Sequence, residues 1–356
     1  AAGGLSIIGK HDGTGGAVTR GTVLSQLLYE IGGPDYLGPD VTARFDTIEV
    51  TEAGPDRVRI SGVRGRSAPS TLKVATNQLG GYRNGFSLAL TGPDIETKAA
   101  LARATFWDSC PFEPDDFAAI DDRIIRTDHP DPSTQEAATA TWRVTVKDSD
   151  EAKVGRAVTD ALIQTALASI PGMYALGGGP SAAAPFGVYR PATVPATLVP
   201  ARVHVIGDDT VTEVASHHAF APVGEIASGT SGDDRSAASV STDVSAMVDV
   251  PLARLIGTRS GDKGGNANLG VFVRSAEAWT WLDGFLTIDR LAELLPEAAG
   301  GAIERYRFPN LWALNFVLVG LLQEGVAAST RQDAQAKALG EWLRARVVTV
   351  PAALVD

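Results

Sequence analysis

One stretch of the sequence, residues 227–246, cannot supply a hydrophobic core, and it divides the rest of the chain into two regions. Ser, Thr, Gly, Asp and Ala dominate this stretch. Such a composition buries little apolar surface and is typical of a linker between domains. The sequence therefore predicts a main domain at residues 1–225, a polar linker at residues 226–247 and a small domain at residues 248–356.

The main region opens with an apolar run at residues 5–10, then a glycine-rich loop, then apolar residues at helical spacing as far as residue 31. A strand, a glycine loop and a helix in this order indicate an α/β domain. Two runs of alternating polarity predict a β-hairpin at residues 45–51 and 57–63. We also expect strands at residues 72–77, 86–90, 139–146 and 201–206, and helices at residues 93–107 and 148–168. In the second helix Val154, Val158, Leu162 and Leu167 are expected to face inward.

The expected elements of the C-terminal region follow a different order, in which two strands precede each helical part. Strands are expected at residues 250–256, 269–273, 303–308 and 313–319, and helices at residues 276–282, 289–295 and 331–347. A polar loop is expected at residues 257–268, between the first two strands. This order predicts a small α+β domain in which helices cover one sheet.

The charge balance excludes some classes of partner. Among 356 residues, Lys and Arg total 31 and Asp and Glu total 42, so the formal net charge is -11. Nucleic acids and anionic membranes attract concentrated positive charge, so we expect neither as a partner. The longest apolar run, at residues 313–322, is about half the length that a membrane-spanning helix needs. We expect a soluble, cytoplasmic protein.

Cysteine and histidine usage argues against a metal site. Cys110 is the one cysteine, so neither an intrachain disulfide nor a cysteine-rich zinc site can form. Cys110 stands where a helix is expected to run into a turn, which favours a structural thiol over a catalytic one. His217 and His218 have no third ligand at a suitable spacing. We predict no metal and no cofactor.

The first candidate site is the loop that follows residues 5–10. Backbone N–H groups of Gly15 and Gly16, ahead of a helix, are able to bind an anion, and Lys10 and Arg20 would add positive charge. The alternative is a tight turn that needs glycine for its φ angles. His11 beside Asp12 is a candidate acid–base group, with a surface or capping role as the alternative. The candidate residues here are Lys10, His11, Thr14, Gly15, Gly16 and Arg20.

The second candidate site is the polar string at residues 259–268, which concentrates cations, amides and one carboxylate between apolar strands. Arginine offers a planar fork for carboxylate or phosphate, and lysine offers a mobile charge. The alternative is a hairpin connection in which Asp and Asn bond to nearby backbone groups. We expect an ordered loop that contacts another domain or subunit. Its candidate residues are Arg259, Asp262, Lys263, Asn266 and Asn268, with Asp262 as a candidate catalytic group.

Four motifs resemble the acyclic terpene utilisation AtuA family. Three of them resemble the main domain of that family, and the fourth is similar to the segment that opens its small C-terminal, ferredoxin-like domain. The motifs are Gly9-Lys10-His11-Asp12-Gly13-Thr14-Gly15-Gly16, Pro55-Asp56-Arg57-Val58-Arg59-Ile60-Ser61-Gly62, Leu79-Gly80-Gly81-Tyr82-Arg83-Asn84 and Ile256-Gly257-Thr258-Arg259-Ser260-Gly261-Asp262-Lys263-Gly264-Gly265-Asn266-Ala267-Asn268-Leu269-Gly270.

The resemblance implies an α/β main domain that lacks its N-terminal part, joined to a ferredoxin-like domain. It also adds Tyr82, Arg83 and Asn84 to the residues expected to bind substrate. The family name implies an enzyme of acyclic terpene, branched acyl-CoA or organic-acid catabolism, with a hydro-lyase as the expected reaction class and a CoA thioester as a candidate substrate. The alternative is a non-catalytic assembly subunit. In either case we expect a homo-oligomer, or a separate polypeptide that supplies the missing part.

Overall fold

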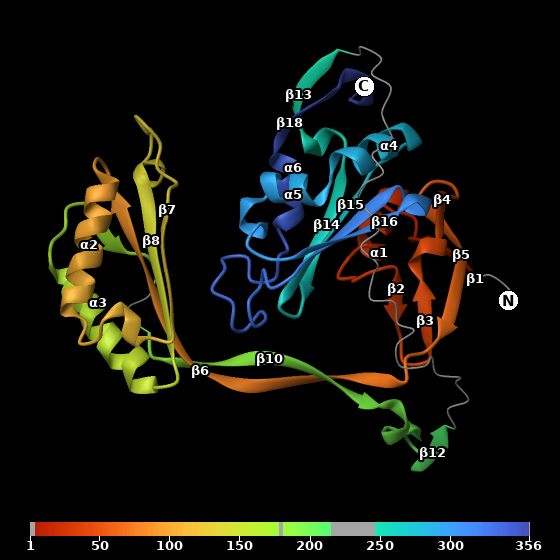
Figure 1. The fold of residues 1–356 in the computed structure, drawn as a ribbon, viewed down its shortest axis with the longest axis horizontal. Coiled ribbons are helices and arrows are strands. Elements are labelled where there is room, and N and C mark those ends of the chain that lie inside the picture. The colour runs from red at the N-terminus through yellow and green to blue at the C-terminus, as the bar shows by residue number, and fades with distance from the viewer. Residues whose placement is uncertain (1–3, 178–180, 215–245, 356) are drawn as a thin grey trace. The chain divides into compact units, whose positions relative to one another are not determined.

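The structure is a computed structural model that describes residues 4–177, 181–214 and 246–355. The chain forms two compact units, whose elements are labelled in Figure 1. Unit 1 comprises Ala1–Thr76 and Tyr189–Asp356, and unit 2 comprises Asn77–Val188. The predicted linker at residues 226–247 lies almost wholly outside the described residues, so the predicted domain limits remain a prediction.

The N-terminal part of unit 1 is a sheet with one helix. The sheet has the order β1-β5-β3-β2, and β4 pairs with β5. The predicted first strand, the helix and the hairpin are confirmed, except that Phe45–Thr47 forms a 3-10 turn instead of extending the strand. Thr19 caps the helix, because its hydroxyl accepts a hydrogen bond from the Thr22 N–H. The elements are β1 (Gly4–Gly9), α1 (Arg20–Leu27), β2 (Asp35–Leu37), β3 (Val41–Arg44), β4 (Glu49–Glu52) and β5 (Arg57–Ser67).

The C-terminal part of unit 1 is a four-stranded antiparallel sheet in the order β14-β15-β17-β16. The predicted small sheet layered with helices is therefore confirmed. Its elements are β14 (Gly257–Lys263), β15 (Asn266–Phe272), α4 (Ala276–Phe285), α5 (Ile288–Leu294), β16 (Ile303–Phe308), β17 (Ala313–Leu318) and α6 (Leu339–Ala345). A separate ribbon pairs β13 (Met247–Pro251) with β18 (Val347–Pro351).

Three predictions for this part are wrong. The strand expected at residues 250–256 is β13, which ends at Pro251 and runs into a 3-10 turn. The closing helix begins only at Leu339, because the Asp333 carboxylate accepts the N–H groups of Lys337 and Ala338 and holds the preceding residues in turns. The polar loop expected at residues 257–268 is a β-hairpin, in which Lys263 pairs with Asn266 across a turn at Gly264 and Gly265.

The glycines of this hairpin allow α1 to approach the sheet closely. A Cβ atom added to Gly261 would lie 2.7 Å from Tyr29 Cε2, and one added to Gly270 would lie 2.5 Å from Leu28 Cβ. Real Cβ atoms do not approach so closely, so the close approach requires glycine at both positions. The core between α1 and this sheet contains Val23, Leu24, Leu28, Ile31, Phe272 and Phe308.

Unit 2 contains a sheet in the order β10-β6-β8-β7, with β9 paired to β6. Its elements are β6 (Thr71–Thr91), α2 (Ile95–Ser109), β7 (Ala119–Ile125), β8 (Thr139–Asp148), α3 (Val158–Leu167), β9 (Met173–Ala175) and β10 (Ala184–Pro195), of which β6 and β10 extend into unit 1. Both helices cover the same side of β8 and β7 (Figure 1). The core beneath them is built around Trp142, Phe106, Leu88 and Val158. The two strands expected at residues 72–77 and 86–90 are one continuous strand, β6.

The predicted mixture of helices and sheets is confirmed, but the α/β arrangement of the main domain is not. Strand pairs in residues 4–175 whose register is defined are antiparallel. The strand expected at residues 201–206 is β11 (Ala201–Val205), which forms an exposed hairpin with β12 (Thr210–Val214). Among the helices in the described part of the chain, none is both long and apolar enough to span a membrane.

Candidate functional site

The first loop is closed by its own contacts. Lys10 Nζ donates to the Thr14 carbonyl at 2.6 Å and lies 3.4 Å from the Asp56 carboxylate. The Thr14 hydroxyl donates to the His11 carbonyl at 2.6 Å. Gly16 has a φ of 81°, which favours glycine, and Gly15 and Gly16 are both exposed. These contacts support the tight-turn interpretation, and the anion site and the catalytic role of His11 remain predictions.

Arg20 joins the start of α1 to the C-terminal part of unit 1. Its guanidinium donates to the carbonyls of Val273 and Leu311, at 3.2 and 2.7 Å, and lies 4.6 Å from the centre of the Trp312 ring. Burial lowers the pKa of Arg20, and the nearby Glu52 carboxylate opposes that shift. These contacts give Arg20 a structural role, and its predicted role in substrate binding remains a prediction.

The two asparagines of the hairpin also have structural partners. Asn266 Oδ1 accepts the Gly320 N–H at 2.9 Å. Asn268 is completely buried, and its Oδ1 accepts the Glu30 N–H at 2.7 Å while its Nδ2 donates to Asn315 Oδ1. Asn268 therefore holds the chain that leaves α1 against the middle of the sheet.

Three candidate residues from the segment at 259–268 lie together around Lys337, in a group that we call the Lys337 cluster. Lys337 Nζ donates to the Tyr29 hydroxyl, to the Glu30 carboxylate and, at 3.1 Å, to Asp262 Oδ1. The Arg259 guanidinium stacks 4.3 Å from the centre of the Tyr29 ring. Lys263 Nζ donates to the Glu30 carbonyl at 2.8 Å. The cluster comprises Tyr29, Glu30, Arg259, Asp262, Lys263 and Lys337.

The Lys337 cluster shifts the pKa values of its members. Burial disfavours the charges of Lys337 and Glu30, but their hydrogen bonds outweigh it, so the pKa of Lys337 is raised and that of Glu30 is lowered. Desolvation and the charge of Lys73 lower the pKa of Lys263, against the opposing influence of Glu30. The charged groups of the cluster are therefore held mainly by bonds to one another and to the Glu30 carbonyl.

The two candidate sites predicted from the sequence do not form one site, because their contacts lie at opposite ends of α1. The first candidate site includes Arg20, the first residue of the helix, whereas Lys263 and Lys337 contact Glu30, beyond its last residue. An eight-residue helix is about 12 Å long. The sequence did not indicate Tyr29, Glu30 or Lys337, because no motif marks residues that only the fold brings together.

The third motif lies in unit 2, on β6. Tyr82 is partly buried and packs against the core of this unit. Asn84 Nδ2 donates to the Ser181 carbonyl at 2.9 Å, and the Ser181 hydroxyl donates to Asn84 Oδ1 at 2.6 Å. Arg83 stands opposite Lys147 in the pairing of β6 with β8. Asn84 therefore fixes Ser181, which borders the pocket described next.

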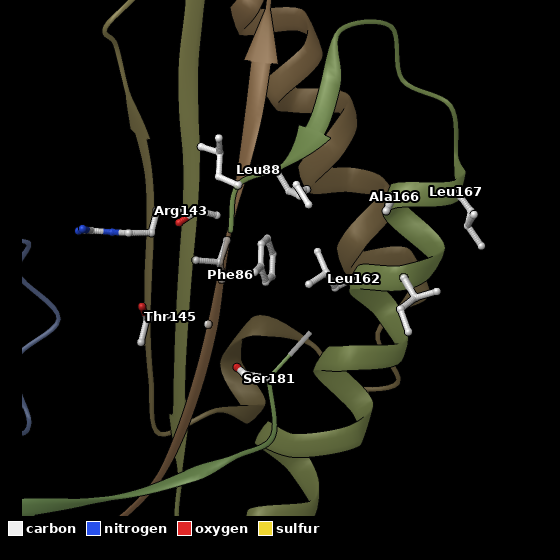
Figure 2. Close-up of a pocket in the computed structure, with 14 residues that line it drawn as sticks. Phe86, Leu88, Arg143, Thr145, Leu162, Ala166, Leu167 and Ser181 are labelled. Atoms are coloured by element: carbon white, nitrogen blue, oxygen red, sulfur yellow. The ribbon is translucent and has the colours of Figure 1, made fainter. Parts of the chain in front are cut away.

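A pocket of about 530 Å³ lies in unit 2 between the β6 edge and α3. Phe86 and Leu162 face each other across it in Figure 2. Its apolar lining includes Phe86, Leu88, Leu162, Ile163, Ala166 and Leu167, and its polar lining includes Ser87, Arg143, Thr145 and Ser181. Leu167, expected to face inward, is 76% exposed, because α3 carries apolar residues beyond the face that packs on the sheet. Adjacent apolar residues at 162–163 and 166–167 were a signal of this wider apolar surface.

The remaining candidates from the sequence are a cysteine and two histidines. Cys110 ends α2 as expected, and burial raises the pKa of its thiol, which disfavours a reactive thiolate. His217 and His218 lie outside the described residues. Within residues 4–177, 181–214 and 246–355, no group of three His, Cys, Asp or Glu side chains is placed to hold a metal ion.

Replacing Lys337 with methionine is expected to remove part of the pH dependence of stability. The lowered pKa of Glu30 contributes stability above about pH 4, and this is lost as the pH falls through the folded value. The raised pKa of Lys337 contributes stability below about pH 10, and this is lost as the pH rises through its folded value. Urea unfolding from pH 3 to pH 11 should therefore show the largest difference from wild type between about pH 5 and pH 10.

The matched control is Arg156→Met, because the Arg156 side chain is 91% exposed and its ion pair with Asp160 lies on the surface. This control should follow the wild-type pH profile. An equal loss of stability at pH 3 and pH 7 in Lys337→Met would contradict the electrostatic role of the cluster.

Comparison with known families agrees with the motifs. The family model described as acyclic terpene utilisation family protein AtuA matches residues 1–205, and the AtuA ferredoxin-like domain matches residues 250–349. Neither the curated proteins nor the solved structures give a significant match. The second match coincides with the sheet β14-β15-β17-β16 and its helices. Because the first match covers more than half of the chain, the protein belongs to the acyclic terpene utilisation AtuA family.

Proposed function

We propose that this chain binds the branched hydrocarbon part of an acyclic terpenoid acid, or of its thioester, in the pocket of unit 2. The observation that supports this proposal is the pocket itself, whose volume of about 530 Å³ is bordered mainly by Leu, Ile, Ala and Phe side chains. Small-molecule sites range from about 300 to 1,000 Å³ and are mostly apolar with a few polar groups. The family description supplies the class of ligand.

The exposed apolar side chains of α3 give such a ligand a source of binding energy. Ile163 is 43% exposed and Leu167 is 76% exposed, and both line the pocket. Removing apolar surface from water contributes about 25 cal/mol per Å². A branched chain lying between α3 and Phe86 would cover this surface, whereas a small polar metabolite would not.

We propose a hydro-lyase as the reaction class, with Asp262 as the group that moves the proton and with Arg259 and Lys263 as anion-binding groups. Lys337 Nζ donates to Asp262 Oδ1 at 3.1 Å, so this carboxylate lies in a polar, hydrogen-bonded position that suits a general base. A CoA thioester is the proposed form of the substrate. The alternative is a non-catalytic assembly subunit, which is favoured by the structural contacts of Arg20 and Asn268.

Filling the pocket tests the binding proposal. Wild-type protein should bind a branched acid of two isoprene units in calorimetry, and more tightly than an unbranched acid of equal carbon number. Leu162→Trp should weaken that binding by about tenfold or more, since an indole would occupy the space of the branched chain. The matched control is Leu101→Trp on α2, because Leu101 is 52% exposed and is not part of the lining.

The outcomes separate the candidate functions. Equal affinity in wild type and Leu162→Trp, or no binding by wild type, would overturn the pocket proposal. Binding without any hydration or dehydration of the branched thioester, in wild type and Asp262→Asn alike, would favour the assembly subunit over the hydro-lyase.

A further inference from the structure

The polar residues that line the pocket of unit 2 differ in what they present to it. Phe86 and Leu88 on β6 are part of the core under the helices or pack against it, so Ser87 between them points to the other face of the sheet. Arg143 and Thr145 also point away from α3 in Figure 2. These three polar residues therefore border the pocket mainly through their backbone.

Ser181 is the polar residue of the lining that lies on the helix-covered side of the sheet. Its carbonyl accepts a hydrogen bond from the Thr159 hydroxyl of α3 at 3.2 Å and another from Asn84 Nδ2 at 2.9 Å. Two donors therefore occupy the two lone pairs of this carbonyl. The group that Ser181 can present to a ligand is its hydroxyl.

The hydrogen bonds of Asn84 fix the direction in which the Ser181 hydroxyl donates. Asn84 is buried, and its Oδ1 accepts the Gly85 N–H at 2.8 Å. A backbone N–H only donates, so this bond identifies Oδ1 as the oxygen of the amide. The Ser181 hydroxyl lies 2.6 Å from the same oxygen, which has no proton to give, and therefore donates to it. The hydroxyl proton of Ser181 is thus used inside the protein.

With its proton bound to Asn84, the Ser181 hydroxyl offers a ligand only its acceptor lone pairs. A carboxylate or a phosphate also offers lone pairs, so neither finds a donor in this hydroxyl. A ligand that covers the hydroxyl removes it from water, and a polar oxygen left without a partner costs binding free energy. The group of the ligand that contacts Ser181 therefore has to be a hydrogen-bond donor.

We infer that Ser181 selects a ligand whose branched chain carries an uncharged hydrogen-bond donor, a hydroxyl group being the simplest. The inference rests on the proposed function and adds the polar chemistry of the bound chain. Such a chain would place its carbons between Phe86 and Leu162, which face each other across the pocket, and would donate its proton to Ser181 Oγ. The carboxylate or thioester end of the same molecule would lie away from this hydroxyl.

Two ligands with the same two-isoprene skeleton test the donor: the alcohol, which donates and accepts, and its methyl ether, which only accepts. In calorimetry, wild-type protein should bind the alcohol about fivefold more tightly than the ether, although the ether has more apolar surface to bury. Ser181→Ala should remove that advantage and leave the affinity for the ether within about twofold. Ser181→Thr keeps the hydroxyl and should retain most of the advantage.

The matched control is Ser149→Ala, because Ser149 is an exposed serine of unit 2 whose hydroxyl donates to Asp148 and which is not part of the lining. This variant should bind both ligands as wild type does. If wild type binds both ligands equally tightly, or if folded Ser181→Ala keeps the preference for the alcohol, the donor inference fails and the proposed function stands. If neither ligand binds, the proposed function itself fails. A circular-dichroism melt shows whether each variant is folded, and the comparison of the two ligands in wild type needs no variant.

Discussion

Replacing Asn268 with alanine is expected to destabilise unit 1 by about 3 kcal/mol. Asn268 is completely buried, and its side chain accepts from the Glu30 N–H and donates to Asn315 Oδ1. Asn315 in turn donates to the Gly32 carbonyl. Alanine would leave the Glu30 N–H and the Asn315 amide oxygen without these partners in a dry interior, and each lost partner costs about 1 to 3 kcal/mol.

Hydrogen exchange of the β15 and β17 amides measures this loss within unit 1, without assuming that both units unfold together. Asn266→Ala is the control, because Asn266 makes one exposed bond to the Gly320 N–H and its loss should cost about 1 kcal/mol or less. Equal exchange rates in Asn268→Ala and wild type would show that the amide is not needed for stability. In that case, Asn268 would again be a candidate for substrate binding.

The composition of residues 259–268 explains why this segment was predicted to be a loop. A run of Gly, Asn, Asp and Lys usually marks a turn, and only Gly264 and Gly265 form one here. Gly261 and Gly270 allow the end of α1 and the residues after it to pack closely on the sheet, and Asn268 bonds to the chain that leaves that helix. A helix packed closely on a strand gives the strand a loop-like composition, and the sequence alone does not show that the helix is there.

Elements set by local pattern were predicted well. The helical spacing after Gly16 predicted α1, which ends at Leu27 and not at residue 31, and the strands expected at residues 303–308 and 313–319 are β16 and β17. The closing helix was predicted too long because side-chain bonds from Asp333 compete with helical hydrogen bonds. Local patterns of hydrophobicity do not include that competition.

The candidate sites were harder to predict than the fold, because each combines residues from distant segments. The Lys337 cluster joins the end of α1, β14 and the approach to α6. The pocket joins β6, β8, α3 and β9, and only Asn84, which bonds to Ser181, connects it to a predicted residue. Register and helix packing decide such groupings, and both depend on contacts between residues far apart in the sequence.

Replacing Asp122 with alanine is expected to destabilise unit 2 by about 3 kcal/mol. Its Oδ1 accepts the Trp142 indole N–H at 2.9 Å, and Trp142 is completely buried. The same carboxylate accepts Arg103 Nε and Nη2, at 2.9 and 2.7 Å, and so links α2 to β7. Arg103 is about a third exposed, so water would solvate much of its charge, and most of the cost comes from the indole N–H left without its partner.

Hydrogen exchange of the β7 and β8 amides, together with Trp fluorescence, measures the effect of Asp122→Ala. Asp128→Ala is the matched control, since Asp128 also pairs with an arginine, Arg126, whose side chain is 48% exposed, and the change in stability should be clearly smaller. Asp122→Asn separates charge from hydrogen bonding, because an amide oxygen still accepts the indole N–H. If Asp122→Asn is as unstable as Asp122→Ala, the charge pair with Arg103 dominates and the buried N–H does not.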